Sequence, residues 1–334
     1  MMTLQDDIED ILNEMRQDTS SEIRRLVEQL ENLRPDRLIK TLESPRKNIK
    51  RNLEIITKYF SPLAQYKEFW PFFIKMLSED DPNVQKIAVT TLLPYIQNID
   101  IQDAFVNVVR DYNVGKRVVN ALSPLAENNV ALRKSMVNTF LKSTWPIDEE
   151  TAKSLSKLVR IDFLFKNELI NKLKDQNRKT KLRSAKILSL VARSDQLIQN
   201  EFLPLLDDEF DELCAQVVKA LAFLVPQDEN IKQKFFNLYE NRKGVVGKEI
   251  EVGLRSIADN DPAFEKYLMD VFFKSPLLKI LCINTLLPLS ENHTNVKKFF
   301  LDKISDKDIF HAFVRASIND QEIRGAVKVI SSRY

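Results

Sequence analysis

The sequence contains few of the residues that most enzymes and β-sheet folds require. Only 5 of its 334 residues are glycine, and it has 2 cysteines and 2 histidines. Glycine supplies the tight turns and phosphate loops of Rossmann, P-loop and hairpin-rich β folds, so its scarcity disfavours all three. Two cysteines and two histidines form no recognisable zinc pattern. We therefore expect no cofactor and no metal site.

Long apolar runs and a strong charge imbalance are also missing. The sequence has no stretch of about 18 apolar residues, so we expect no membrane span. Its N-terminus, MMTLQDDIEDILNEM, lacks the basic and apolar regions of a signal peptide. The formal net charge of +2 does not by itself indicate nucleic acid. These features predict an intracellular protein, cytoplasmic with the nucleus as second option, in which Cys214 and Cys282 are core residues.

The apolar residues follow a helical period. In Ile74 to Asn98 one apolar run ends at Leu77, and a second begins at Val84 after Asp81-Pro82. Proline suits the first turn of a helix, so this stretch predicts a helical hairpin. The pattern recurs, because an apolar residue closes the first helix of each hairpin at spacings of 32 to 35 residues. These anchors are Leu42, Leu77, Val109, Leu141, Leu173, Leu206, Leu238, Phe272 and Ile304.

The second helix of each hairpin presents a matching apolar residue about fourteen positions after the anchor. These residues are Ile56, Leu92, Leu122, Leu155, Ile187, Leu221, Val252, Leu286 and Ile318. Helical hairpins of this period form an α-solenoid, so the predicted fold class is all-α. We predict one continuous domain over 1–334, with an N-terminal capping hairpin at 1–34, about nine repeats over 35–320 and a C-terminal cap at 321–334.

The hairpins resemble HEAT repeats, whose signature is an acid in the turn and a base six positions later. The matching pairs are Asp80/Lys86, Asp111/Arg117 and Asp175/Lys181, whereas Asp208/Cys214 and Asp306/Ala312 keep only the acid. The resemblance implies a HEAT-like α-α superhelix. In such a stack, these charges can form bonds between neighbouring repeats.

Among HEAT proteins, the sequence most resembles the scaffold (A, PR65-type) subunit of protein phosphatase 2A. The similar patches are ILNEMRQD, from Ile11, and LKILCINTLLPLS, from Leu278. That family has fifteen repeats, and this chain has about nine or ten. The resemblance implies a scaffold that binds protein partners, such as a phosphatase catalytic or regulatory subunit. Karyopherin-like transport adaptors and other HEAT adaptors are the alternatives.

The residues that invite a catalytic interpretation have a simpler structural one. His293 lies in an inter-repeat loop and His311 begins a second helix, and the sequence predicts no oriented partner or nucleophile beside either. Gly244 to Lys248, GVVGK, is two residues short of a P-loop and is typical of helix punctuation. The acidic run Asp207 to Glu209 lacks the glycine-containing spacing of an EF-hand. We predict no catalytic residue and no enzymatic activity.

Two basic clusters raise nucleic-acid binding as an alternative. Arg34 to Lys58 contains eight Lys/Arg and three Asp/Glu, and Lys172 to Lys186 contains seven Lys/Arg and one Asp. HEAT-like DNA glycosylases, which the chain would then resemble, use a basic concave face. However, the acidic turn after the anchor Leu206 belongs to the repeat that follows the basic turn after Leu173. Alternating signs favour a protein partner.

The intra-repeat turns carry the clearest signal for partner binding. Aromatic residues stand where a short turn is expected to be exposed, and basic residues lie in or next to such turns. The candidate partner-binding residues are Tyr112, Trp145, Arg178, Lys179, Phe210, Arg242 and Lys243. Exposed aromatic and Arg side chains are typical of interface hot spots. The alternative for each aromatic is that it folds back onto its own hairpin.

Overall fold

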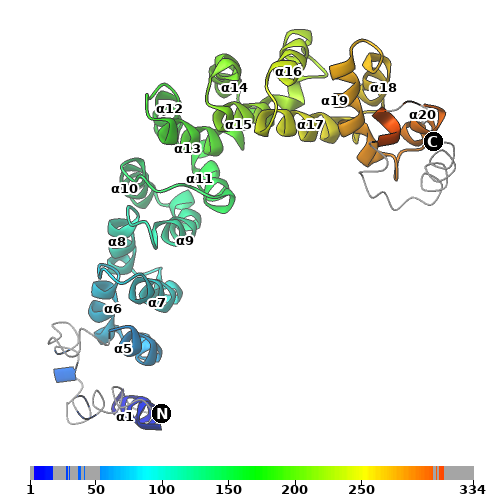
Figure 1. The fold of residues 1–334 in the computed structure, drawn as a ribbon. Coiled ribbons are helices and arrows are strands. Elements are labelled where there is room, and N and C mark those ends of the chain that lie inside the picture. Colours follow the sequence, from blue (N-terminus) through cyan, green and yellow to red (C-terminus); the bar gives the residue numbers. More distant parts are fainter. Residues whose placement is uncertain are drawn as a thin grey trace. The chain divides into compact units, whose positions relative to one another are not determined.

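The computed structural model describes residues 4–17, 28, 30, 37, 38, 41, 53–303, 306 and 308–311. These residues form helices and turns and no strand, which confirms the all-α class (Figure 1). The α-helices are α1 (Leu4–Gln17), α5 (Leu53–Tyr59), α6 (Trp70–Met76), α7 (Pro82–Leu92), α8 (Ile99–Val108), α9 (Gly115–Asn128), α10 (Val130–Leu141), α11 (Glu149–Ile161), α12 (Phe163–Lys172), α13 (Arg178–Ser189), α14 (Gln196–Phe202), α15 (Asp211–Leu221), α16 (Glu229–Asn241), α17 (Val245–Ala258), α18 (Pro262–Val271), α19 (Pro276–Leu286) and α20 (Thr294–Asp302). Short 3-10 helices join or extend them at η1 (Ser61–Gln65), η2 (Lys67–Phe69), η3 (Leu93–Tyr95), η4 (Ala192–Ser194), η5 (Leu203–Asp207), η6 (Ala222–Leu224) and η7 (Leu287–Leu289).

The chain divides into two compact units, residues 1–165 and 166–334. Within unit 2 the second helices of successive hairpins pack side by side, α13 on α15, α15 on α17 and α17 on α19. The first helices form the other layer, and α16 and α18 both contact α17 (Figure 1). Unit 1 repeats this arrangement, with α9 packed against both α10 and α11. Each unit is thus a stack of helical hairpins, while the single continuous solenoid over 1–334 stays a prediction.

Helix starts follow the local signals in the sequence. The Asp81 carboxylate accepts a hydrogen bond from the Asn83 N–H at 2.8 Å, and Pro82 occupies the first position of α7. Asp148 caps α11 in the same way, and the Ser275 hydroxyl accepts from the Leu278 N–H at 3.1 Å before α19. Side-chain caps of this kind satisfy backbone N–H groups that the helix leaves without a partner.

A second set of caps recurs between the hairpins. Short polar side chains bind the first N–H groups of α8, α10, α12, α14, α16 and α18, at spacings of 31 to 33 residues. They are Asn98, Asn129, Asp162, Asp195, Asp228 and Asp261. This period had not been recognised in the sequence, although the residue types and spacing are visible there.

Most anchors in the described residues fill the core, and two positions depart from expectation. Leu77, Val109, Leu173, Leu206, Leu238 and Phe272 are buried, whereas Leu141 is half-buried. Val252 is 53% exposed, so its predicted core role is wrong. Helix α17 turns Val246, Ile250 and Leu254 inward at four-residue intervals, which puts a residue two positions away on the opposite face. The anchors Leu42 and Ile304, with the matching Ile318, lie outside the described residues.

The first helix, α1, buries one apolar stripe, namely Ile8, Ile11, Leu12 and Met15. The N-terminal capping hairpin at 1–34 stays a prediction. Asp7 on the same helix accepts hydrogen bonds from the Tyr66 hydroxyl at 2.6 Å and the Gln65 amide at 3.0 Å. Most of the second half of this hairpin, and all of the C-terminal cap at 321–334, lie outside the described residues.

The two cysteines are core residues, as the sequence predicted. Cys214 and Cys282 are free thiols, and both are buried. Burial raises the pKa of Cys282 to about 12, so its thiol stays protonated at neutral pH.

Candidate partner-binding surface

Ion pairs between repeats join the turns of unit 2. Lys181 on α13 donates to the Asp208 carboxylate in the next turn at 3.0 Å. Three repeats further on, Lys279 on α19 donates to Asp306 at 2.6 Å and to Asp308 at 2.8 Å. The expectation that turn acids bond between neighbouring repeats is therefore confirmed at these positions.

Asp208 is bonded from the hairpins on both sides of it. Burial acts to raise its pKa, but bonds from the Phe210 N–H and the Lys181 ammonium hold the pKa of Asp208 below its usual value. Arg242 from the following turn donates to the Asp208 carbonyl at 2.5 Å and lies 3.4 Å from the Asp211 carboxylate. The Asp208 carboxylate thus binds α13, and its backbone carbonyl binds the following turn.

Several predicted partner-binding residues come together along this edge. The Arg178 guanidinium lies 5.6 Å from the centre of the Phe210 ring, a cation–π distance. Phe210 is half-buried, while Arg178, Lys179 and Lys243 are exposed. Arg242 is half-buried, because its guanidinium reaches back to the preceding turn. We call the described residues of turns 173–179, 206–211, 241–245 and 272–275 the turn ridge.

Trp145 does not belong to an exposed surface, so its predicted exposure is wrong. Its side chain is 2% exposed, and its indole Nε1 donates to the Val109 carbonyl at 2.9 Å. The ring packs edge-on against Phe140, with centroids 5.6 Å apart. The close approach depends on Gly115, where a β-carbon would lie 2.8 Å from Nε1 and 2.4 Å from the Val109 oxygen. Burying the large indole while its N–H keeps a partner is the more stable arrangement.

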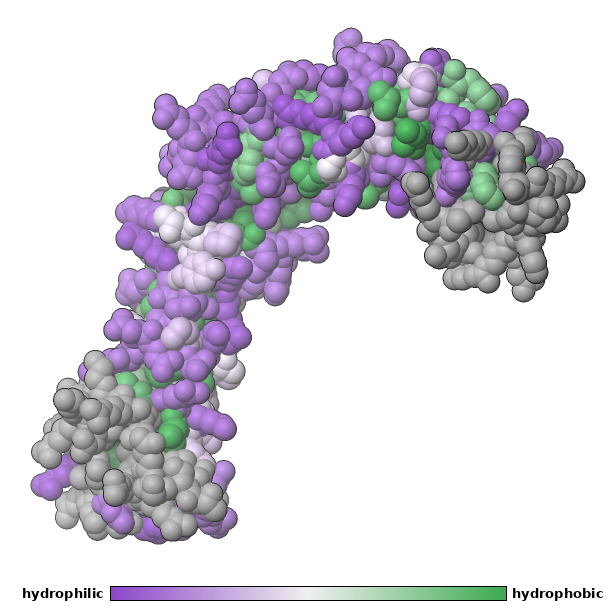
Figure 2. Space-filling view, viewed as in Figure 1, coloured by the Kyte–Doolittle hydropathy of each residue, from purple (hydrophilic) through white to green (hydrophobic). Residues whose placement is uncertain are grey.

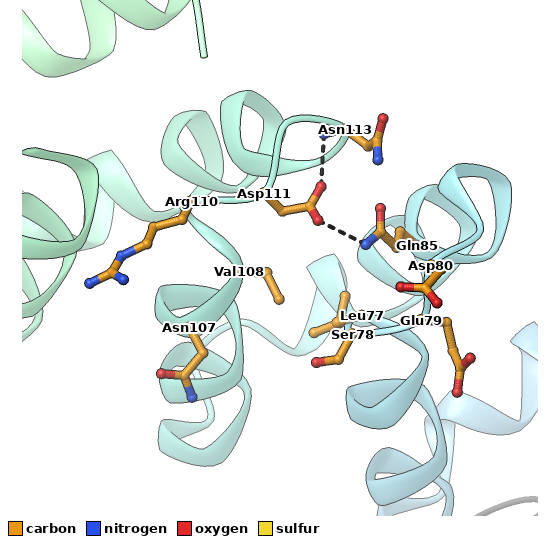
Figure 3. A pocket seen from close by; sticks show the side chains of 10 residues that line it. All are labelled: Leu77, Ser78, Glu79, Asp80, Gln85, Asn107, Val108, Arg110, Asp111 and Asn113. Carbon is orange, nitrogen blue, oxygen red and sulfur yellow. Dashed lines mark hydrogen bonds between the residues drawn. The ribbon is translucent and has the colours of Figure 1, made fainter. Parts of the chain in front are cut away.

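Tyr112 is exposed as predicted, in a turn of unit 1. Its side chain is 69% exposed. The adjacent Asp111 accepts hydrogen bonds from the Asn113 N–H at 2.7 Å and the Gln85 amide at 3.0 Å. Figure 3 shows these groups beside an open cavity of about 510 Å³ between two successive turns, where Glu79 and Asp80 supply further acids. This part of the turn side is polar and acidic.

The sequence analysis missed the most exposed hydrophobic side chain of the turn ridge. Phe273 is 66% exposed, and Val245 on the neighbouring turn is 41% exposed. The sequence identified Phe272 as a core anchor and left Phe273 undecided. Successive residues of a helix point about 100° apart, but adjacent phenylalanines can both be buried, as Phe72 and Phe73 are.

Three lysines of the basic cluster Lys172 to Lys186 are paired with neighbouring acids. Lys174 lies 3.1 Å from Glu201, Lys181 lies 3.0 Å from Asp208, and Lys172 lies 4.0 Å from Asp175. Such pairing leaves less positive charge for phosphates than the sequence suggested. Most of Arg34 to Lys58 lies outside the described residues, so convergence of the two clusters remains a prediction.

The residues that had suggested catalysis or ligand binding are explained by their places in the helical hairpins. His293 precedes α20 and lies between Glu265, 2.6 Å from its Nδ1, and Asp259, 3.1 Å from its Nε2. His311 is exposed. Gly244 has φ +80° and sits at the start of α17, so GVVGK is helix punctuation. Across the described ranges, no three His, Cys, Asp or Glu side chains are placed to hold a metal, and no helix is long and apolar enough to cross a membrane.

Comparisons with known proteins found structural neighbours of low sequence identity and no family. No family model matches it, and no curated protein sequence does so significantly. An engineered protein is 17% identical, over 96% of this chain and 97% of its own, with a TM-score of 0.36. The E. coli protein YibA is 15% identical over 80% of this chain and 98% of its own, with a TM-score of 0.42.

Karyopherins are also among the structural neighbours. Kap121p bound to the extreme C-terminus of the protein phosphatase Cdc14p is 10% identical, over 99% of this chain and 47% of that one, with a TM-score of 0.48. This chain spans about half the length of that karyopherin. By its own helices the chain is an all-α solenoid, and its structural neighbours include a karyopherin.

Proposed function

We propose that the chain is a non-enzymatic scaffold or adaptor that binds protein partners through the turn ridge of unit 2. One observation carries this proposal. Successive turns are joined by Lys181, Asp208 and Arg242, and they expose aromatic, apolar and basic side chains along one edge. A surface held in place by its own hydrogen bonds loses little entropy when a partner docks.

Two observations support a binding role over catalysis. Both ring nitrogens of His293 contact carboxylates that hold hairpins together. The thiol of Cys282 is fully buried, and its raised pKa disfavours the reactive thiolate. The proposal therefore includes no reaction.

The more specific identity, a scaffold subunit of a protein phosphatase 2A-type complex, rests on the two similar sequence patches. Their residues Ile11, Leu12, Met15, Leu281 and Cys282 are buried. Core positions of helical hairpins favour such residues in any solenoid, so we place the general adaptor function first. A transport adaptor of the karyopherin kind is another form of the same function. The identity of recovered partners separates these possibilities.

The test is affinity purification from a cell lysate, with mass spectrometry of the bound proteins. The full chain is compared with a Phe210→Ala/Lys243→Glu double variant, which alters the middle of the turn ridge. We expect the variant to keep its helical circular dichroism and to lose its specific partners. Phe163→Ala is the matched control, because this phenylalanine is 63% exposed but lies in unit 1, off the ridge. Equal partner recovery by the double variant would count against the proposal.

A further inference from the structure

One end of the turn ridge carries an aromatic side chain that the core does not use. Phe273 follows α18, and its side chain is 66% exposed, whereas that of Phe272 is 2% exposed. Figure 2 shows hydrophobic side chains at the surface over α18 and α19. A phenylalanine left in water gains free energy when a partner covers it.

The Phe273 ring is held in place by other aromatic rings. It meets Phe272 edge-on, with centroids 5.0 Å apart, and Phe299 of α20 with centroids 6.4 Å apart. Phe299 in turn packs against Phe300, which is fully buried. Edge-to-face contacts of this kind fix ring orientation. The exposed ring is therefore preorganised for contact, because its position is set from two successive hairpins.

Two lysines near this ring, Lys274 and Lys303, have no acidic partner among the described residues. The Lys303 ammonium lies 5.5 Å from the Phe273 ring centre, and the Lys274 ammonium lies 5.9 Å from that of Tyr267. Within the described part of the chain, neither ammonium has a carboxylate within 4.0 Å. The nearby Lys279 differs from these two lysines, because its ammonium pairs with the carboxylates of both Asp306 and Asp308. We call Phe273, Phe299, Lys274 and Lys303 the aromatic–lysine patch.

We propose that the aromatic–lysine patch binds a protein segment in which a large apolar side chain is flanked by carboxylates. This inference rests on the proposed function and names the partner chemistry at one end of the ridge. The apolar side chain covers the Phe273 ring, and the flanking carboxylates pair with Lys274 and Lys303. Charge complementarity selects an acidic segment, because the patch supplies two unneutralised cations.

A protein segment fits this surface better than a nucleic acid. Glu240 contacts Ser275 on the same edge, and Asp306 and Asp308 surround Lys279. A polyanion with one charge per nucleotide would meet these acids as well as the two lysines. A short acidic segment can place its carboxylates at the lysines alone.

The test measures binding of the full chain to a labelled synthetic peptide of about twelve residues, with a central Phe between Asp and Glu residues. Two control peptides carry Asn and Gln in place of the acids, or Ser in place of the Phe. We expect binding of the acidic peptide to weaken about tenfold in Lys274→Glu/Lys303→Glu, since both exposed ion pairs are lost and the reversed charges repel the peptide. We expect a comparable loss in Phe273→Ala.

Matched variants control for charge and for loss of an exposed ring. Lys266→Glu/Lys298→Glu makes the same charge change at exposed positions on α18 and α20, and Phe163→Ala removes an exposed ring elsewhere. Both should bind the acidic peptide like the unaltered chain. Equal binding of all three peptides, or equal weakening by patch and control variants, overturns the proposal. So does tighter binding of a single-stranded DNA 20-mer with the same dependence on the patch lysines.

The peptide test and the lysate test fail independently. The peptide measurement concerns Phe273, Lys274 and Lys303, whereas the lysate comparison alters Phe210 and Lys243. If the Phe210 variant loses its partners and the peptide does not bind, the partner chemistry is wrong and the adaptor function stands. If the peptide binds at the patch and lysate partners are unaffected by the Phe210 variant, the docking role of the central ridge is wrong.

Discussion

At Trp145 a single hydrogen bond joins one turn of unit 1 to the preceding hairpin. The indole Nε1 donates to the Val109 carbonyl at 2.9 Å inside the core. In Trp145→Phe that carbonyl loses its donor, and an unsatisfied buried polar group costs roughly 1–3 kcal/mol. We expect the free energy of unfolding to fall by about this amount, measured by urea denaturation with circular dichroism.

The other tryptophan offers a matched control. Trp70 Nε1 also donates to a backbone carbonyl, that of Ala64 at 2.8 Å, but its side chain is half-buried. In Trp70→Phe water can reach the released carbonyl, so the loss should be smaller. Equal destabilisation by the two substitutions would mean that burial of the hydrogen bond at Trp145 does not increase its contribution to stability.

Single residues were predictable where the cause is local. Asp81 and Pro82 indicated the start of α7, because a cap and a first-turn proline act on the backbone beside them. Trp145 was not predictable in this way. Its burial depends on the space left by Gly115, thirty residues earlier, and on the Val109 carbonyl. Sequence spacing within one hairpin contains no information about that approach.

At the scale of elements, the capping positions between hairpins continue to His293 before α20, whose side chain makes no cap hydrogen bond. Lys166 on α12 donates at 2.8 Å to Asp195, which caps α14. At the corresponding places near α18 and α20 the chain has Glu265 and His293, joined at 2.6 Å. Glu265 stands where Lys166 stands in the earlier pair, and His293 stands where Asp195 does. Because a histidine takes part, this connection can titrate near neutral pH.

The direction of this titration follows from the contacts of His293. The bond to Glu265 raises the pKa of His293 above 6.5, against the opposing effect of burial, and Asp259 adds to the rise. A pKa that is higher in the folded state gives stability that is fully present below pH 6.5 and is lost as the pH rises through the folded value. We expect the urea midpoint to fall over that interval, and His293→Gln to remove the dependence.

The chain supplies its own control, because it has only two histidines. His311→Gln, at an exposed position, should leave the pH dependence intact. The exchange Glu265→Lys/His293→Asp restores the usual polarity and should also remove it. At Asp195, burial acts to raise the pKa, but bonds from Lys166 and the backbone keep it low, so that connection stays charged throughout. An unchanged pH profile in His293→Gln would contradict this account.

Elements were predicted better by type than by the face they bury. The hairpin period placed the helices well, but it assigned Val252 to the core of α17, where Ile250 and Leu254 take that role. A fixed spacing fails there because the interval from the anchor to the start of the second helix varies between hairpins. Periodicity likewise identified Phe272 as an anchor and said nothing about Phe273, whose proposed role depends on Lys303 from the next repeat.

For the whole molecule, the decisive feature is the locality of its contacts. Among residues 53–303, the extensive contacts join helices no more than three apart in chain order. Stability in such a chain is approximately a sum of repeat and nearest-neighbour terms, so local damage need not unfold distant repeats. The period alone predicted this property, since every hairpin needs only its neighbours to bury its apolar face.

Hydrogen exchange measured by mass spectrometry tests this locality directly. Trp145→Ala removes a large buried side chain and its bond to Val109, so amides of α9, α10 and α11 should exchange faster. Amides of α17, α18 and α19 should keep their protection, because these helices belong to unit 2 and the altered turn belongs to unit 1. Tyr112→Ala, at a 69% exposed side chain, should change neither region. Faster exchange spread evenly over both units would show that the chain unfolds as one cooperative body, and would refute the nearest-neighbour description.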